Sequence, residues 1–302
     1  MLTEGIFTEK YRPQMVEDVV GGAADIIRPF MKNPKSMPHF LFYSNANGVG
    51  KSSMAKAIVR QLGLSKNEVM TLNASNDRKI ETIRDKVLPF VRSRNINPEV
   101  RKIVFLDEAE RLTTVAQEAL LNMMETYSDI AQFILTTNRI NLLDNGIVDR
   151  CEKINFAYPK ADEIFVLIQT MCEEENIAFT EQGLNRLIEM NYPSIRSMVK
   201  GLQSLKTQDR EVTFENVAKN ISLYDTVWDM VKEKDLQGVQ RFIIEEGIDC
   251  RDLNMHLWHK SLMESDPPNM KALQITCQNE KAMATGSNPQ IVLVTSLLEL
   301  VK

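Results

Sequence analysis

The segment Asn47-Gly48-Val49-Gly50-Lys51-Ser52-Ser53 is the part of the sequence that decides the fold. It follows the apolar run Phe40-Leu41-Phe42-Tyr43, and apolar residues recur after it at helical spacing, at Met54, Ile58 and Leu62. A strand, a glycine loop and a helix N-terminus in that order form a phosphate cradle, because backbone N–H groups and the helix dipole both favour an anion. The lysine would reach the outer phosphates, and the first serine would bind Mg²⁺.

A second segment, Ile103-Val104-Phe105-Leu106-Asp107-Glu108, is an apolar strand that ends in two carboxylates. Asp107 can hold a metal ion, and Glu108 can polarise a water molecule. Taken alone, two such carboxylates are more simply explained as solvated charges at the end of a strand. Together with the glycine loop, they predict a nucleoside triphosphate hydrolase.

The phosphate loop departs from the pattern G-x-x-x-x-G-K-[ST] at its first glycine, where this chain has Asn45. Asparagine is the non-glycine residue that best tolerates positive φ, so we expect the turn to survive. A chance glycine turn is the alternative explanation for the whole loop. The strand that ends in Asp107 and Glu108 argues against it.

Composition is that of an ordinary soluble protein, with 302 residues, 43% hydrophobic and 25% charged. This length suffices for two or three domains with their own cores. No apolar run is long enough to span a bilayer, and the N-terminus has no signal-peptide pattern. The cysteines form no C-x-x-C pair, which argues against structural zinc and disulfides and predicts a reducing compartment. They are Cys151, Cys172, Cys250 and Cys277.

Residues 78–102 have a charge opposite in sign to the net charge of −5 of the whole chain. They contain eight lysines and arginines and three acidic residues, a net charge of +5. Ile80, Ile83 and Val87 recur there at helical spacing and leave Arg84 on a solvent face. Such a face is most often merely solvated, so charge alone does not predict a DNA site.

Several segments resemble the clamp-loader AAA+ ATPases and occur in that family's order over residues 1 to about 220. Thr8-Glu9-Lys10-Tyr11-Arg12-Pro13 with Val19-Val20-Gly21 is similar to the E-K-Y-R-P box. Leu72-Asn73-Ala74-Ser75-Asn76-Asp77-Arg78 resembles the N-A-S-D-D-R segment of replication factor C small subunits. The other matches are Asp107-Glu108-Ala109-Glu110 (Walker B), Phe133-Ile134-Leu135-Thr136-Thr137-Asn138 (sensor 1), Asp149-Arg150-Cys151 (S-R-C) and Pro193-Ser194-Ile195-Arg196 (sensor 2). The short chain and the departures at Asn45 and Asp149 make the ATPase subunit of tailed-phage clamp loaders the most similar group.

This resemblance implies a site for ATP and Mg²⁺. Ser52 and Asp107 would hold the metal, Glu108 would orient the attacking water, and Asn138 would hydrogen-bond the water or the γ-phosphate. Arg196, on a helix of the next domain, would touch the γ-phosphate. The residues implied to hold ATP are Thr8, Glu9, Lys10, Tyr11, Val20, Gly48, Val49, Gly50, Lys51, Ser52, Ser53 and Arg196.

In S-R-C-type ATPases the arginine acts in trans, so the resemblance implies that Arg150 enters the site of a neighbouring subunit. Asp149 replaces the usual serine, which alters the hydrogen bonding around it. An ion pair between Asp149 and Arg150 is the alternative, but adjacent residues rarely face each other. The catalytic residues implied are Lys51, Glu108, Asn138 and, in trans, Arg150.

The predicted helix from Ile80 to about Val91 would serve two partners in this family. Lys79 and Arg84 would meet the phosphates of primer–template DNA. The clamp would contact an apolar group near the end of the helix, made of Leu88, Phe90 and Val91. The alternative assigns Val87, Phe90 and Val91 to the domain core, and for Val87 we adopt it.

The expected architecture is α/β, a P-loop AAA+ parallel sheet with helices on both faces, followed by a helical lid and an all-helical collar. The expected domains are 1–157 for nucleotide binding, 158–222 for the lid and 223–302 for the oligomerising collar. These bounds are based on alternating strand and helix patterns in the first range and on helical periodicity in the other two.

The implied function is that of the ATPase subunit of a sliding-clamp loader. Its partners would be primer–template DNA, the clamp, other copies of itself and a distinct loader subunit in a five-subunit ring, with no membrane involved. It would act in the cytoplasm, that of the host cell if the protein is viral. The alternatives are another DNA-remodelling AAA+ ATPase, for branch migration or initiation, and a non-hydrolysing scaffold subunit.

Overall fold

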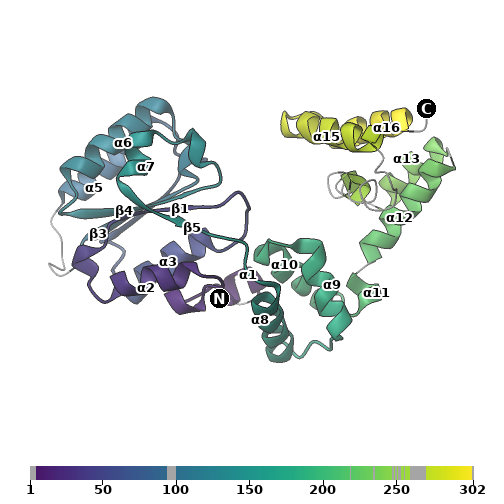
Figure 1. Ribbon diagram of the computed structural model, residues 1–302, viewed down its shortest axis with the longest axis horizontal. Helices are drawn as coiled ribbons and strands as arrows, with labels where there is room; N and C mark the ends of the chain where they lie inside the picture. The colour runs from purple at the N-terminus through teal and green to yellow at the C-terminus, as the bar shows by residue number, and fades with distance from the viewer. Residues whose placement is uncertain are drawn as a thin grey trace. The chain divides into compact units, whose positions relative to one another are not determined.

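The computed structural model describes residues 5–93, 100–217, 219–233, 235–246, 248, 250, 253–254, 256–258 and 270–300. The chain divides into two compact units, Met1–Thr213 and Phe214–Lys302 (Figure 1). This division lies ahead of the predicted boundary at residue 222, and the predicted boundary at residue 157 lies inside the first unit, so the three-domain division stays a prediction. Arg94 and Glu99 of the basic stretch lie outside the described residues.

A five-stranded parallel sheet lies at the centre of the first unit, as the sequence predicted. Its strands are His39–Tyr43 (β1), Val69–Asn73 (β2), Lys102–Asp107 (β3), Ala131–Thr137 (β4) and Cys151–Asn155 (β5). Their order across the sheet is β2-β3-β4-β1-β5. β1, β3 and β4 are buried along almost their whole length, as is typical of parallel strands that are covered on both faces.

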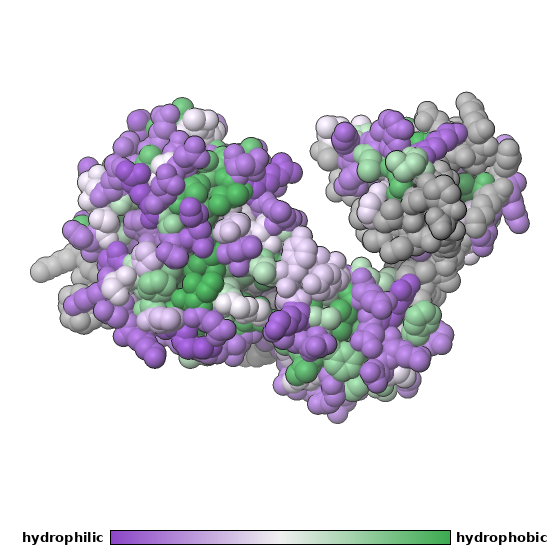
Figure 2. All heavy atoms as spheres, in the orientation of Figure 1, coloured by the Kyte–Doolittle hydropathy of each residue, from purple (hydrophilic) through white to green (hydrophobic). Residues whose placement is uncertain are grey.

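Helices cover both faces of this sheet (Figure 1). One face carries Ala23–Met31 (α2) and Lys51–Gln61 (α3), and the other carries Thr114–Thr126 (α6) and Asn145–Asp149 (α7). Successive residues of β1 point to opposite faces, so Phe42 joins the core beneath α3 while Leu41 joins the core beneath α6. On the face of the molecule drawn in Figure 2, hydrophilic residues cover most of this unit and apolar residues reach the surface in a few places.

The functional loops all follow the carboxyl ends of strands. The glycine loop follows β1, Glu108 follows β3, and Asn138 follows β4. In the sheet β4 lies between β1 and β3, with Leu135 paired to Leu41 on one side and to Leu106 on the other. These three strand ends therefore meet at one edge of the sheet, where ligands of open α/β sheets bind.

The predicted helix in the basic stretch is present as three consecutive helical segments. They are Ile80–Thr82 (α4), the π-helical Ile83–Val87 (η3) and Leu88–Arg92 (α5). Val87 and Val91 have 0% exposure and pack in the main core, so the prediction that Val91 contacts the clamp is wrong. Leu88 and Phe90 are half-buried against the same core and keep part of their surface outside.

Lys102, the first residue of β3, is buried beneath the end of α5, with 1% exposure. Its Nζ donates to the carbonyl oxygens of Phe90 (2.9 Å) and Ser93 (2.6 Å) and lies 5.0 Å from the centroid of the Phe90 ring. Burial lowers the pKa of this lysine, with Glu68 opposing. The ammonium thus binds two carbonyls at the end of the helix and lies against the Phe90 ring, which fixes the orientation of Phe90.

A small helical bundle completes the first unit. It consists of Ala161–Glu174 (α8), Glu181–Asn191 (α9) and Ile195–Thr207 (α10), and the N-terminal helix Phe7–Lys10 (α1) packs on α10. Thr180 and Ser194 cap α9 and α10 through their side-chain oxygens. Short 3₁₀ turns occupy connections of this unit, at Val16–Asp18 (η1), Pro34–Ser36 (η2), Ala109–Arg111 (η4) and Ile140–Leu142 (η5).

The second unit is helical over its described residues, as predicted. Its helices are Phe214–Val217 (α11), Lys219–Lys232 (α12), Leu236–Glu245 (α13), Met270–Ala284 (α15) and Pro289–Leu300 (α16). Within its apolar core Asn279 donates through Nδ2 to Asn254 Oδ1 (3.0 Å) and to Ser296 Oγ (2.7 Å). Such a satisfied buried network fixes how these helices pack. Among the described residues of the whole chain, no helix has the length and hydropathy needed to cross a membrane.

Candidate nucleotide-binding site

The glycine loop has the backbone conformation that its sequence predicted. Gly48 and Gly50 have φ values of +75° and +100°, and Gly50 caps the N-terminus of α3, which begins at Lys51. A Cβ atom at position 48 would lie 2.4 Å from Ser194 Oγ, so the close approach of Ser194, which caps α10, requires glycine. Asn45 is not among the residues with positive φ. The turn therefore tolerates asparagine for a simpler reason than the one we expected, since the position does not demand a left-handed backbone.

Lys51 lies at the centre of this loop with 8% exposure, and its Nζ donates to the carbonyl of Ala46 (2.7 Å). Burial lowers the pKa of Lys51 to about 8; Glu110 and Asp107 oppose this shift and Arg196 adds to it. An incoming polyphosphate would stabilise the charged form of this lysine. The loop thus holds a cation whose charge is only partly compensated, which suits an anionic ligand.

We expect the affinity for ATP to fall as the pH rises from about 7 to about 9. The folded-state pKa of Lys51 is below its ordinary value, so the ammonium that phosphates need is lost as the pH passes this pKa. The Kd should change little below this pKa and rise toward tenfold per pH unit above it. Fluorescent-nucleotide titrations across this range measure it, and Lys51→Arg, which keeps its charge, should bind with a flat profile. A wild-type Kd that stays constant over this range would contradict the role of Lys51.

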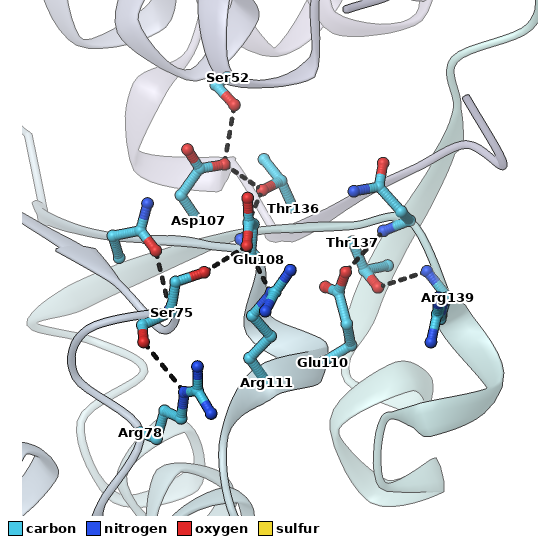
Figure 3. Close-up of polar contacts among 12 residues, drawn as sticks. Ser52, Ser75, Arg78, Asp107, Glu108, Glu110, Arg111, Thr136, Thr137 and Arg139 are labelled. Atoms are coloured by element: carbon cyan, nitrogen blue, oxygen red, sulfur yellow. Dashed lines mark hydrogen bonds and ion pairs between the residues drawn. The ribbon is translucent and has the colours of Figure 1, made fainter. Parts of the chain in front are cut away.

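Asp107 forms the centre of a group of oxygen atoms at the end of β3 (Figure 3). Its Oδ1 accepts hydrogen bonds from Ser52 Oγ (2.7 Å) and Thr136 Oγ1 (2.5 Å). A carboxylate and a hydroxyl at this distance suit Mg²⁺, which takes one or two protein oxygens and completes its shell with water and phosphate. Ser52 and Asp107 would therefore hold this metal, and Thr136 would orient the carboxylate.

Glu108 has a left-handed backbone, with φ of +57°, and its carboxylate is held by neighbouring side chains (Figure 3). Oε2 accepts hydrogen bonds from Ser75 Oγ and from Arg111 Nε (2.6 Å). The backbone N–H of Glu108 donates to Thr136 Oγ1 (3.1 Å). A left-handed non-glycine residue costs about 1–3 kcal/mol and is common where function fixes the backbone. Both side-chain contacts therefore hold the carboxylate through Oε2.

Asn138 and Glu110 face each other next to this carboxylate. The backbone N–H of Asn138 donates to Glu110 Oε1 (3.3 Å), while Asn138 Oδ1 and Glu110 Oε2 are buried and have no hydrogen-bond partner among the described residues. Buried polar atoms are normally paired, so these two oxygens indicate a missing polar ligand or water. Both oxygens are acceptors, so they suit a donor such as a water molecule.

A cavity of about 660 Å³ joins these groups. It is lined by the glycine loop and the strand ends, by the N-terminal segment, and by residues of α8 and α10. Lys10 is not among the residues that line it, and its ammonium pairs with Glu175, so a contact of Lys10 with ATP stays a prediction. The predicted residues that line the cavity are Thr8, Glu9, Tyr11, Val20, Gly48, Val49, Gly50, Lys51, Ser52, Ser53, Asp107, Glu108, Asn138 and Arg196.

Arg150 is not among the residues that line this cavity. It follows α7 and is 40% exposed, and its guanidinium pairs with Glu125 and donates to the carbonyl of Gly146 (3.1 Å). Within its own chain it therefore contacts Glu125 rather than Asp149. Its action in a neighbouring subunit stays a prediction.

Sequence reasoning missed the side chains that hold the predicted ones in place. Ser75 and Arg111 bind Glu108, Thr136 binds Asp107, and Glu110 contacts Asn138. The role of Thr136 could have been predicted, because a hydroxyl at the end of a buried strand needs a hydrogen-bond partner. Ser75 and Glu108 are far apart in sequence, and no local pattern connects them.

Comparisons with known proteins agree with this geometry. Residues 40–158 match the AAA family, "ATPase family associated with various cellular activities". The replication factor C small subunit of Methanococcus maripaludis is 35% identical over 217 residues, which cover 70% of this chain and 68% of that protein. The corresponding subunit of Haloarcula marismortui is 31% identical over 314 residues, covering 98% of this chain and 95% of that protein.

A solved structure with a similar fold is the Thermotoga maritima RuvB Holliday junction branch migration motor. It covers 79% of this chain and 86% of its own, with a TM-score of 0.57 and 14% identity. At that identity the likeness shows the shared fold alone. The similarity to the two small subunits extends over most of their length, so the chain belongs to the replication factor C small subunit family.

Proposed function

We infer that this chain is the ATPase subunit of a sliding-clamp loader. It would use ATP to open a clamp and place it on primer–template DNA, and hydrolysis would release the loaded clamp. The observation that supports this most strongly is the cavity in which the glycine loop, the Asp107 oxygen cluster, Asn138 and Arg196 meet, in a chain of the replication factor C small subunit family.

Each side chain of the cavity would have one task. The backbone N–H groups of 48–53 and the Lys51 ammonium would bind the phosphates, and Ser52 and Asp107 would hold Mg²⁺. Bound ATP–Mg²⁺ supplies the polarised γ-phosphate. Glu108 would orient the attacking water, Asn138 would hydrogen-bond it or the phosphate, and the lid would contribute Arg196.

The proposed assembly is a five-subunit ring that contains other copies of this chain and a distinct loader subunit. Arg150 would stabilise transition-state charge in the site of a neighbouring copy. The helical region 223–302 would act as the collar that holds the ring together. A phage origin and a place in the cytoplasm of the host complete this proposal.

DNA would bind at the start of the basic helix. Lys79, which precedes α4, and Arg84 are exposed, and neither has an ion pair within the described part of the chain. The same segment reaches the catalytic site, because Arg78 Nε donates to the carbonyl of Ser75 (2.9 Å) and the Ser75 hydroxyl binds Glu108. Contact with DNA phosphates could thus reposition Ser75 and free the carboxylate, which would make hydrolysis depend on DNA.

Primer–template DNA and clamp should stimulate the ATPase of the purified protein with its partner subunit. Lys79→Ala and Arg84→Ala should each reduce the DNA-stimulated rate and flatten its log–log salt slope by about one unit, while the basal rate is unchanged. Lys66→Ala, at the opposite end of β2, is the matched control and should behave as wild type. If stimulation survives with both basic residues removed, the DNA site lies elsewhere. If DNA and clamp have no effect on the wild type, the loader assignment is wrong.

The clamp would contact the half-buried residues Leu88 and Phe90, with Val91 now excluded. Lys102 binds the carbonyl of Phe90 and lies against its ring, so the Phe90 side chain would meet the clamp in a single orientation. A branch-migration motor is the other candidate, and the likeness to RuvB supports it only at the level of the fold. A non-hydrolysing scaffold would have no need for the complete set of Lys51, Asp107 and Glu108.

A further inference from the structure

Glu175, the residue that follows α8, collects three hydrogen-bond donors on one carboxylate. Its Oε1 accepts from Lys10 Nζ (2.5 Å) and from Tyr11 Oη (2.9 Å), and its Oε2 pairs with Lys206 Nζ. The side chain of Glu175 is only 8% exposed. Lys206 also donates to the backbone carbonyl of Glu175 (2.9 Å), so each element involved is fixed to the others.

The carboxylate of Glu175 is ionised at neutral pH. Burial acts against its ionisation, but the hydrogen bonds from Lys10, Lys206 and Tyr11 outweigh burial and lower the pKa of Glu175 to about 2. Burial and the bond to Glu175 raise the pKa of Tyr11, so its hydroxyl remains a donor. Because the folded-state pKa of Glu175 is lowered, its contacts contribute their full stability above the ordinary pKa of a glutamate. This contribution is lost as the pH falls from that value toward 2.

The N-terminal segment is joined to the lid at a second point as well. Gln203 of α10 donates through Nε2 to the carbonyl of Gly5 (2.7 Å) and accepts the N–H of Phe7 (3.2 Å) through Oε1. The Phe7 ring is 5% exposed and packs edge-on against Tyr11, with centroids 5.6 Å apart. Residues 5–11 are therefore attached to α8 and α10.

These two helices also carry residues of the nucleotide cavity. Met171 of α8 and Arg196 of α10 line it, as do Thr8 and Tyr11 of the N-terminal segment, whereas Glu175 itself does not. The aromatic and aliphatic end of the cavity and the arginine at its phosphate end thus belong to one body. Glu175 lies at the point where the three parts of that body meet.

We propose that Glu175 is a positioning residue that sets the affinity for the base end of a nucleoside triphosphate, by holding Tyr11 and the N-terminal segment on the helix that carries Arg196. This inference rests on the proposed nucleotide site. Glu175 acts through Lys10, Tyr11 and Lys206 and contacts no phosphate. Its loss should therefore weaken the binding of ATP and leave the phosphate cradle of 48–53 intact.

The test compares ATP with inorganic tripolyphosphate, both with Mg²⁺, on the full chain. Glu175→Gln should raise the Kd for ATP on the order of tenfold and leave the Kd for tripolyphosphate and the kcat at saturating ATP unchanged. Glu173→Gln, which makes the same change on an exposed neighbour, should behave as wild type. Glu175→Asp keeps the charge and should restore part of the ATP affinity. An unchanged Kd for ATP, or an equal loss for both ligands, would overturn the proposal.

Tyr11→Phe provides a second test that does not depend on removing a buried charge. It deletes only the hydroxyl that Glu175 accepts and keeps the ring against Phe7. It should raise the Kd for ATP alone, and it should add little on the Glu175→Gln background, because both changes break the same contact. Additive effects would refute the coupling. If the wild type binds neither ATP nor tripolyphosphate, the proposed function itself has failed.

Discussion

Glu108→Gln is expected to bind ATP normally and to lose turnover by about 100- to 10,000-fold, the usual contribution of a general base. The amide keeps the size of the side chain and can still accept a hydrogen bond from Ser75, but it cannot take a proton from water. The Ser52–Asp107 pair and the glycine loop are untouched, so binding should persist. Steady-state hydrolysis and nucleotide titration separate the two quantities.

Two further variants make this result specific. Lys51→Ala removes the ammonium of the cradle and should raise the Kd for ATP, in contrast to Glu108→Gln. Glu118→Gln makes the same chemical change on an exposed part of α6 and should leave both quantities unchanged. Hydrolysis by Glu108→Gln at the wild-type rate would show that another group orients the water.

The fold and the phosphate end of the cavity could be predicted because their signals are local. Glycines at fixed spacing before a lysine specify a loop whose backbone needs positive φ, and Gly48 and Gly50 have it. An apolar run that ends in two acids specifies a buried parallel strand with polar groups at its carboxyl end, which is where Asp107 and Glu108 lie. The helices could be predicted because the spacing of their apolar residues is also a local signal.

The rest depended on contacts between distant positions. The ammonium of Lys10 reaches Glu175, which follows α8, and no local pattern predicts this contact. Ser75 holds Glu108 through a contact made only once β2 and β3 are paired, whereas Arg111 reaches it locally, from three residues along the chain. Val91 is different, because the signal was present: Ile83, Val87 and Val91 are spaced by four and all three are buried. Applying that spacing throughout would have placed Val91 in the core.

Arg150→Ala should leave ATP binding in its own chain intact and reduce hydrolysis at the adjacent site of the assembled ring. Arginine fingers contribute on the order of 10³–10⁵ in rate, and less if displaced. In the isolated chain this guanidinium pairs with Glu125 on the surface, an exposed contact worth little, so it can be exchanged for a phosphate at an interface. Glu125→Gln removes that competing contact and should therefore not reduce the rate.

Mixing distinguishes action in trans from a structural effect within one subunit. Neither Arg150→Ala nor Glu108→Gln rings should turn over, yet rings that contain both variants include sites formed by Glu108 of one subunit and Arg150 of the next. Such sites have both catalytic groups, so mixed rings should regain part of the ATPase rate. Because a defect confined to each subunit cannot be restored by a neighbour, mixed rings of confirmed composition that stay inactive would refute the trans role of Arg150.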